Sequence, residues 1–339
     1  MAPVDLVLMG ALERRILMSK LAVVFGGSGF VGRHVVRELT RRGWRVRVGV
    51  RRPHQAMHLK PMGVVGQVQL TQVNVRHEPS VEQAVRGADA VINLVGILHQ
   101  EGAQKFNSVQ VQGAANIASA CASQNIERLV HLSAIGADAQ SDSLYAHTKA
   151  EGEAAIRANV SGATIMRPSI IFGPEDDFFN RFAAMAQLSP FLPLIGGGKT
   201  RFQPVYVDDV ADAVCGALEN AETIGQTYEL GGPQIYSFKE LMEVMLSEIR
   251  MKRFLVPVPF FAANAMGFGG EAIGLLPMID PFLTRDQVKL LKSDNVVGEG
   301  AKTFNALGIY PRSIEAILPS YMVRYRKYGQ FSEETEQGA

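Results

Sequence analysis

One stretch near the start of the chain decides its fold: Val23-Val24-Phe25-Gly26-Gly27-Ser28-Gly29-Phe30-Val31-Gly32. An apolar run typical of a buried strand leads into glycines at GxxGxxG spacing, and a helical period follows. Gly26 allows a tight turn, Gly29 lets a pyrophosphate approach the backbone, and Gly32 permits close packing of helix on strand. The helix N-terminus adds free amides and the positive end of a dipole. We therefore expect a dinucleotide along Gly26, Gly27, Ser28, Gly29, Phe30, Val31 and Gly32, in preference to a plain turn.

Short β-branched runs alternate with helical periods from Leu21 onward, which is the pattern of βαβ units. Several of these runs are continuously apolar, as strands buried on both faces of a sheet are. The predicted strands are 21–25, 45–50, 68–75, 90–95, 128–133, 163–168 and 227–230. The predicted fold is α/β, a Rossmann-type doubly wound parallel sheet with a small C-terminal lobe.

The regular alternation lapses after Gly173, where prolines and the triplet 196–198 break up the chain. This change divides the predicted organisation into an NADP(H)-binding domain and a small C-terminal lobe over the strand ends. The domain covers 18–173 and also receives 205–231, and the lobe covers 174–204 and 232–325. Residues 1–17 are expected to be a non-native start or a disordered extension, because Met18-Ser19-Lys20 stands directly before the first strand. Residues 326–339 are predicted to be a polar tail.

Net charge, cysteine content and the distribution of apolar residues limit the classes of function that the chain can have. The 339 residues include 34 Lys and Arg against 33 Asp and Glu, so a net charge of +1 provides no overall field that would attract nucleic acid. Cys121 and Cys215 lack partners at metal-ligand spacing, so we expect no metal site and two buried thiols in a reducing, cytoplasmic setting. The apolar stretch 260–283 contains charges, prolines and glycines and makes a poor membrane-spanning helix. The alternative to a purely cytoplasmic protein is one that contacts the inner face of the cytoplasmic membrane peripherally.

Two arginines, Arg51 and Arg52, follow the second predicted strand. An NAD-selective site usually has an acidic residue there, which accepts the ribose hydroxyls. Guanidinium groups instead favour a 2′-phosphate through paired charge-assisted hydrogen bonds. We therefore expect NADP(H) in preference to NAD(H); the alternative is a solvated basic loop before Pro53.

Tyr145 and Lys149 are four residues apart and so share one face of a predicted helix. A nearby ammonium favours phenolate, which lets Tyr exchange a proton with a substrate oxygen, and Lys can reach the nicotinamide ribose. Such a pair is common by chance, but its place after the strand that ends at Ser133 raises it above a surface pair. Asp208 and Asp209 precede an Ala-rich helix and are predicted to cap it, and His131, in mid-strand, is predicted to be buried.

The glycine motif at 26–32 and Tyr145-x-x-x-Lys149 together resemble the extended and atypical short-chain dehydrogenase/reductase superfamily, over roughly 21–324. In that superfamily a Ser or Thr beside the Tyr, the second of two hydroxyl residues after the strand, helps to hold the substrate oxygen. Here the strand ends Ser133-Ala134, so that hydroxyl is either absent or supplied one place early by Ser133. The resemblance also implies backbone contacts to the cofactor from Leu94, Val95 and Gly96. It further implies that Pro168, Ser169 and Ile170 approach the nicotinamide.

A narrower resemblance is to the nucleotide-binding accessory subunits of respiratory complex I and their bacterial relatives. Its motifs are at 167–182, 202–211, 293–296 and 307–311. It implies a tightly held NADPH, no demonstrated turnover, and a role in assembly or stability, with complex I or a quinone-biosynthesis assembly as partner. The alternative is an active NADPH-dependent oxidoreductase or epimerase acting on a quinone, isoprenoid or sugar-nucleotide substrate. In that case Tyr145 is the proton donor, Lys149 lowers its pKa and Ser133 orients the oxygen.

Overall fold

A seven-stranded parallel sheet forms the centre of the computed structural model, which describes residues 20–273, 282–327 and 329. Its strands are β1 (Leu21–Phe25), β2 (Arg45–Val50), β3 (Val68–Gln72), β4 (Ala90–Asn93), β5 (Leu129–Leu132), β6 (Thr164–Pro168) and β11 (Thr227–Leu230). They lie in the order β11-β6-β5-β4-β1-β2-β3. The predicted Rossmann-type fold is confirmed. The predicted start at 1–17 and the tail beyond 329 lie outside the described residues.

All seven predicted strands exist, and four end or begin earlier or later than expected. At β4 the cause is visible: the side chain of Asn93 accepts a hydrogen bond from the backbone N–H of Val95 at 3.1 Å, which turns the chain out of the sheet. Strand ends are therefore decided by such local contacts as well as by apolar runs.

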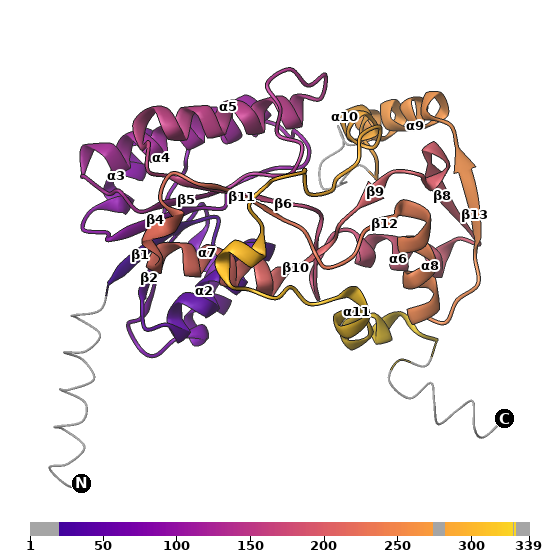
Figure 1. Ribbon diagram of the computed structural model, residues 1–339, viewed down its shortest axis with the longest axis horizontal. Coiled ribbons are helices and arrows are strands. Elements are labelled where there is room, and N and C mark those ends of the chain that lie inside the picture. Colours follow the sequence, from indigo (N-terminus) through magenta and orange to yellow (C-terminus); the bar gives the residue numbers. More distant parts are fainter. Residues whose placement is uncertain (1–19, 274–281, 328, 330–339) are drawn as a thin grey trace, which may run out of the picture.

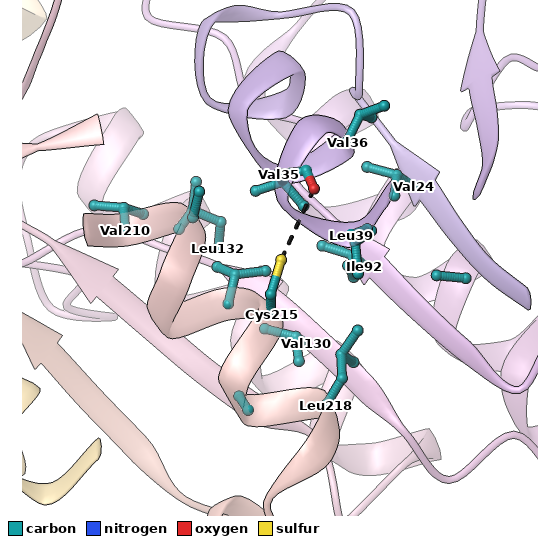
Figure 2. Packing of buried hydrophobic residues seen from close by; sticks show 14 of the residues in the cluster. Val24, Val35, Val36, Leu39, Ile92, Val130, Leu132, Val210, Cys215 and Leu218 are labelled. Carbon is teal, nitrogen blue, oxygen red and sulfur yellow. Dashed lines mark hydrogen bonds between the residues drawn. The ribbon is translucent and has the colours of Figure 1, made fainter. Parts of the chain in front are cut away.

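Helices cover both faces of the sheet (Figure 1). One face carries α3 (Glu78–Val85), α4 (Gln112–Ser123) and α5 (Leu144–Asn159), and the other carries α2 (Phe30–Arg41) and α7 (Val207–Glu219). Two apolar cores fill the spaces between these layers. Figure 2 shows the core under α2 and α7, where the Cys215 thiol lies among valine and leucine side chains and faces the carbonyl oxygen of Val35 at 3.8 Å. Both cysteines are buried, as predicted.

The remaining elements form a smaller C-terminal region beside the strand ends (Figure 1). Its helices are α6 (Phe179–Leu188), α8 (Phe238–Glu248), α9 (Phe260–Ile273), α10 (Arg285–Leu290) and α11 (Ile314–Met322). Its short strands are β7 (Ile171–Phe172), β8 (Phe191–Ile195), β9 (Arg201–Phe202), β10 (Val205–Tyr206), β12 (Tyr236–Ser237) and β13 (Phe254–Val258). They pair only in twos: β10 with β7, β12 with β9, and β13 with β8.

Aromatic side chains dominate the core of this smaller region. Phe178 contacts four other rings, those of Phe179, Phe182, Phe202 and Phe238, with centroids 5.1 to 6.2 Å apart. Ser237 and Glu240 form a capping box at the start of α8. No helix within the described ranges has the length and apolarity needed to cross a bilayer.

Candidate dinucleotide site

The order of the central sheet reverses between β1 and β4, so the loops that follow these two strands flank a crevice where α/β folds bind ligands. The backbone of Gly26 has φ +80°, which favours glycine, and a Cβ there would lie 3.1 Å from the Leu94 carbonyl carbon. The glycine loop after β1 and the loop after β4 are therefore in direct contact.

The backbone amides at the start of α2 have no side-chain cap, although the Glu175 carboxylate lies 3.4 Å from the guanidinium of Arg33 in the same turn. The N-cap of α2 is Gly29, which has no side chain that could accept a hydrogen bond from the first-turn amides, and the turn itself contains no acidic residue. A Cβ on Gly32 would lie 2.2 Å from the carbonyl oxygen of Gly26, so only glycine lets the helix start this close to the strand. Unsatisfied amides and the helix dipole at this point suit a pyrophosphate. The residues present therefore fit the phosphate part of a dinucleotide.

Arg51 and Arg52 come directly after β2, at the same carboxyl end of the parallel strands as the glycine loop. Both are exposed. Neither guanidinium forms an ion pair with any carboxylate in the described part of the chain. Both remain available to a phosphate group near the end of β2.

Tyr145 and Lys149 lie one turn apart in the first half of α5, as predicted. The ammonium of Lys149 donates to the carbonyl oxygen of Leu132 at 3.2 Å and lies 5.9 Å from the centroid of the Tyr145 ring. A Cβ on Gly96 would be 3.2 Å from the Lys149 ammonium, so Lys149 also adjoins the loop after β4.

Burial controls the ionisation of both side chains. It lowers the pKa of Lys149 to about 8 and raises the pKa of Tyr145 to about 12. Tyr145 is thus a neutral phenol at physiological pH, a state in which it can donate a proton, and Lys149 titrates just above neutrality. The edge of the Phe106 ring packs against Tyr145, with centroids 6.0 Å apart.

Ser133 and His131 form a buried polar pair of residues at the end of β5. The hydroxyl oxygen of Ser133 and Nε2 of His131 have no hydrogen-bond partner among the described residues. Nδ1 of His131 lies 3.0 Å from the Asn93 amide nitrogen. Burial, and secondarily the charge of Lys149, lowers the pKa of His131 to about 3, so this ring is neutral. A buried hydroxyl without a partner is costly in a folded protein, and it suits a group that a ligand would satisfy.

The segment Pro168-Ser169-Ile170 starts at the last residue of β6 and is held by a residue that the sequence did not single out as part of a site. The side-chain oxygen of Asn295 accepts hydrogen bonds from the Ser169 hydroxyl at 2.7 Å and from the Ile170 backbone N–H at 3.0 Å. Its amide group donates to the Ile135 carbonyl oxygen at 3.3 Å. Asn295 thus joins the ends of β5 and β6, and nothing in local spacing connects residues so far apart in the chain.

A second residue missed from the sequence is Asp286 of α10. Its carboxylate accepts the backbone N–H of Leu144 at 2.8 Å and that of Tyr145 at 3.1 Å, together with the hydroxyl of Ser143 at 2.8 Å. A carboxylate at a helix N-terminus is favoured by the helix dipole. The smaller region therefore supports the helix that carries Tyr145 and Lys149.

The prediction that Asp208 and Asp209 cap a helix is wrong. Both lie inside the first turn of α7, whose N-cap is Tyr206 without a side-chain cap. Asp208 instead binds His34 and Arg37 of α2, and the almost fully buried Asp209 accepts a hydrogen bond from Nε of Arg312 at 2.7 Å. Both carboxylates pair with cationic side chains that are far away in the sequence. Only folding brings those side chains close, so the local sequence could not indicate the pairs. His131, by contrast, is buried as expected.

Comparison with known proteins identifies the family. The signature of the "NAD dependent epimerase/dehydratase family" matches residues 22–231, more than half of the chain. The chain belongs to this family. The matched segment contains the glycine loop, Tyr145 and Lys149, and it ends just after β11.

Two relatives that match along most of this chain are complex I subunits by name. "NADH dehydrogenase [ubiquinone] 1 alpha subcomplex subunit 9, mitochondrial" from Arabidopsis thaliana is 35% identical over 316 residues, which cover 91% of this chain and 79% of that protein. The mitochondrial "NADH-ubiquinone oxidoreductase 40 kDa subunit" of Neurospora crassa is 32% identical over 90% of this chain and 79% of its own length. A ceramide reductase from Caulobacter vibrioides is 32% identical, over 56% of this chain and 58% of that protein.

A solved dTDP-glucose 4,6-dehydratase from Streptomyces venezuelae with NAD and TYD bound has a TM-score of 0.69 at 20% identity. The structural match covers 94% of this chain and 98% of that dehydratase. At such low identity the likeness concerns the fold alone, and it extends to the smaller region.

Proposed function

We propose that this protein holds NADP(H) tightly, mainly as a structural cofactor, and serves as an accessory or assembly factor for respiratory complex I or a quinone-linked system. The observation that carries the proposal is the match to complex I subunits along about nine-tenths of the chain at 32 to 35% identity. The proposed setting is the cytoplasm, with peripheral contact at the inner face of the membrane.

The proposed cofactor site uses the residues described above. The amides of the α2 first turn hold the pyrophosphate, Arg51 and Arg52 hold the 2′-phosphate, and the loop 94–96 lies along the dinucleotide. Lys149 binds the nicotinamide ribose, and the segment 168–170 borders the nicotinamide. When bound, the nicotinamide can supply or accept a hydride. NADP(H) is proposed over NAD(H) because two guanidinium groups, neither paired with a carboxylate of the described residues, follow β2 where an acidic residue would favour NAD(H).

The structural role is favoured by the end of β5. The position where the superfamily has its second hydroxyl residue is Ala134, and the hydroxyl of Ser133 is buried. A substrate oxygen would have to be held by Tyr145 with only this one deeply placed hydroxyl beside it.

The rival proposal is an active NADPH-dependent oxidoreductase or epimerase. Its support is the retained pair of Tyr145 and Lys149 on one helix, together with the unpartnered Ser133 hydroxyl, which could accept or donate to a substrate oxygen. In that role the neutral phenol of Tyr145 gives its proton to the substrate oxygen.

One preparation tests both proposals. The protein is purified without added cofactor, any bound nucleotide is released and identified by mass spectrometry, and its exchange and oxidation are followed while quinones and isoprenoid carbonyls are offered. Stoichiometric, slowly exchanging NADPH without oxidation is the expected result. Substrate-dependent oxidation that disappears in Tyr145→Phe would replace the structural role by the enzymatic one.

The preference for NADP(H) has its own test. Replacing Arg51 and Arg52 together by glutamate should reverse the preference, because carboxylates repel the 2′-phosphate and accept hydroxyls. The ratio of the two dissociation constants is measured by fluorescence titration, and Arg45→Glu, at the other end of β2, is the matched control. An unchanged ratio would contradict the assignment of these arginines.

A further inference from the structure

The outer face of the β8–β13 ribbon is apolar, and the described residues leave it exposed at the end where both strands begin. A two-stranded ribbon with one face on a core ordinarily alternates apolar and polar side chains. Here the inner residues Leu192 and Leu194 are buried, yet the outer ones are apolar as well. Phe191 and Phe254 pair in register, their centroids are 5.8 Å apart, and they are 55% and 70% exposed.

Helix α9 continues this pattern directly after β13. Of its 14 residues only Asn264 and Glu271 are polar. A helix that is apolar all round is normally buried, but Phe261 is 78% exposed and Phe268 is 62% exposed. Figure 1 places β13 and α9 together at the end of the molecule farthest from β1 and β2. We call the exposed apolar side chains of these three elements the aromatic face: Phe191, Phe254, Val256, Phe261, Met266 and Phe268.

The segment of the chain that contains β13, α9 and α10 carries an excess of positive charge. Residues 250–292 contain six Lys and Arg (250, 252, 253, 285, 289 and 292) and three Asp and Glu (271, 280 and 286), a net charge of +3 against +1 for the whole chain. Glu271 is paired with Arg285 at 2.8 Å. The guanidinium of Arg285 lies 5.5 Å from the Phe268 ring centroid, and the Lys292 ammonium lies 5.9 Å from that of Phe260. Cations thus stand beside the rings.

We infer that the aromatic face docks on the surface of an anionic lipid bilayer, with its phenylalanine rings at the headgroup level and the lysines and arginines on the lipid phosphates. Exposed aromatic and aliphatic side chains joined to an excess of Lys and Arg are what such a surface binds. The inference rests on the proposed function, which includes peripheral contact with the membrane. It adds which surface of the protein makes that contact.

Two other occupants fit the face less well. A partner strand added to the free edge of β13 would meet Pro257, which lacks the N–H that a ladder needs. A second copy of the chain would bring two positively charged faces together, and their repulsion opposes the apolar contact. An anionic bilayer offers an apolar region for the phenylalanine rings and phosphate groups for the lysines and arginines.

The test uses the full chain as purified, sedimented with vesicles of phosphatidylcholine alone and of phosphatidylcholine mixed with phosphatidylglycerol. Binding is expected only to the mixed vesicles, and it should weaken as salt is raised. The double variant F254S/F261S should lower the partition coefficient by roughly tenfold or more, because two inserted rings are lost. Tyr310→Ser, which removes a ring that is 90% exposed outside the aromatic face, is the matched control and should bind as the parent does.

Equal binding to both kinds of vesicle, or equal binding by F254S/F261S and its parent, would overturn the inference. So would a concentration-dependent dimer in sedimentation velocity that F254S/F261S abolishes without any vesicle binding by the parent. Thermal melting checks that the variants fold, which substitutions of exposed side chains should permit. Bound nucleotide is measured in the same samples, so failure of the cofactor proposal and failure of membrane docking are read separately.

Discussion

Different kinds of contact stabilise the central sheet and the smaller C-terminal region. In the sheet, seven parallel strands lie between two layers of helices, and the first six of them follow one another with local connections. The smaller region has only two-stranded pairs, a core of phenylalanine rings and an apolar outer face. The first is built from repeated local units, whereas the second depends on contacts between distant segments. Each of the following predictions tests this difference.

The largest effect is expected from Gly32→Val in the sheet region. The new side chain would begin 2.2 Å from the Gly26 carbonyl oxygen, so strand, turn and helix must move apart. We expect nucleotide affinity to fall by roughly 100-fold or more and stability by about 3 kcal/mol. Isothermal titration and urea denaturation measure the two effects. Gly269→Ala in α9, where a Cβ meets nothing within 4 Å, should leave nucleotide affinity unchanged; equal losses in the two variants would remove the contrast.

The next effect concerns the link from the C-terminal part of the chain to α7. Arg312→Ala leaves the Asp209 carboxylate, whose side chain is only 2% exposed, without its cation. The Arg312 side chain is itself 44% exposed, so its loss should cost less than that of a fully buried partner, about 2 kcal/mol in the free energy of unfolding. Arg201→Ala breaks the exposed pair with Asp294 and should cost less than about 1 kcal/mol. If chemical denaturation gave the same loss for both, burial would not be what distinguishes these pairs.

A smaller effect is expected where the smaller region supports α5. Asp286→Ala removes the acceptor for two α5 amides and should cost about 1 to 2 kcal/mol. Amide hydrogen exchange should speed up in the first turn of α5 and stay unchanged in β1 and β4. Asp286→Asn keeps one acceptor oxygen and should show a weaker effect. Protection lost evenly over the sheet would instead mean that Asp286 acts on global stability.

The smallest effect is a pH dependence of nucleotide affinity. Burial lowers the pKa of Lys149 to about 8, so its ammonium is present below pH 8 and is lost above it. Affinity should decrease by roughly fivefold as pH rises through 8, because a charge-assisted hydrogen bond becomes a neutral one. Lys149→Met should bind more weakly at neutral pH and lack this step. A step of equal size in that variant would assign the titration to another group.

The same shift predicts the sign of a stability change. Because the folded pKa of Lys149 lies below its ordinary value of 10.5, the unfolded chain binds more protons between about pH 8 and 10.5. This group's contribution to the free energy of unfolding should therefore increase with pH over that window, and Lys149→Met should lack the increase.

Much of the sheet region was predictable because its signals are local. The glycine loop, the strands and the Tyr145 helix were read from spacing and apolar runs, and the structure has them where expected, apart from a few strand ends such as the one that Asn93 bends. The division into an NADP(H)-binding domain and a lobe, and the binding roles of the site residues, stay predictions.

What the sequence alone determined was the doubly wound sheet, because glycine geometry, short apolar runs and the 3.6-residue helical period act over a few residues. Only the tertiary structure decided that Asn295 joins the ends of β5 and β6, that Asp286 supports the helix of Tyr145, and that Asp209 pairs with Arg312 rather than capping α7. Only it showed that the described residues leave the aromatic face uncovered. Hydrogen bonds between residues about a hundred positions or more apart depend on how the chain packs, and no local pattern records them.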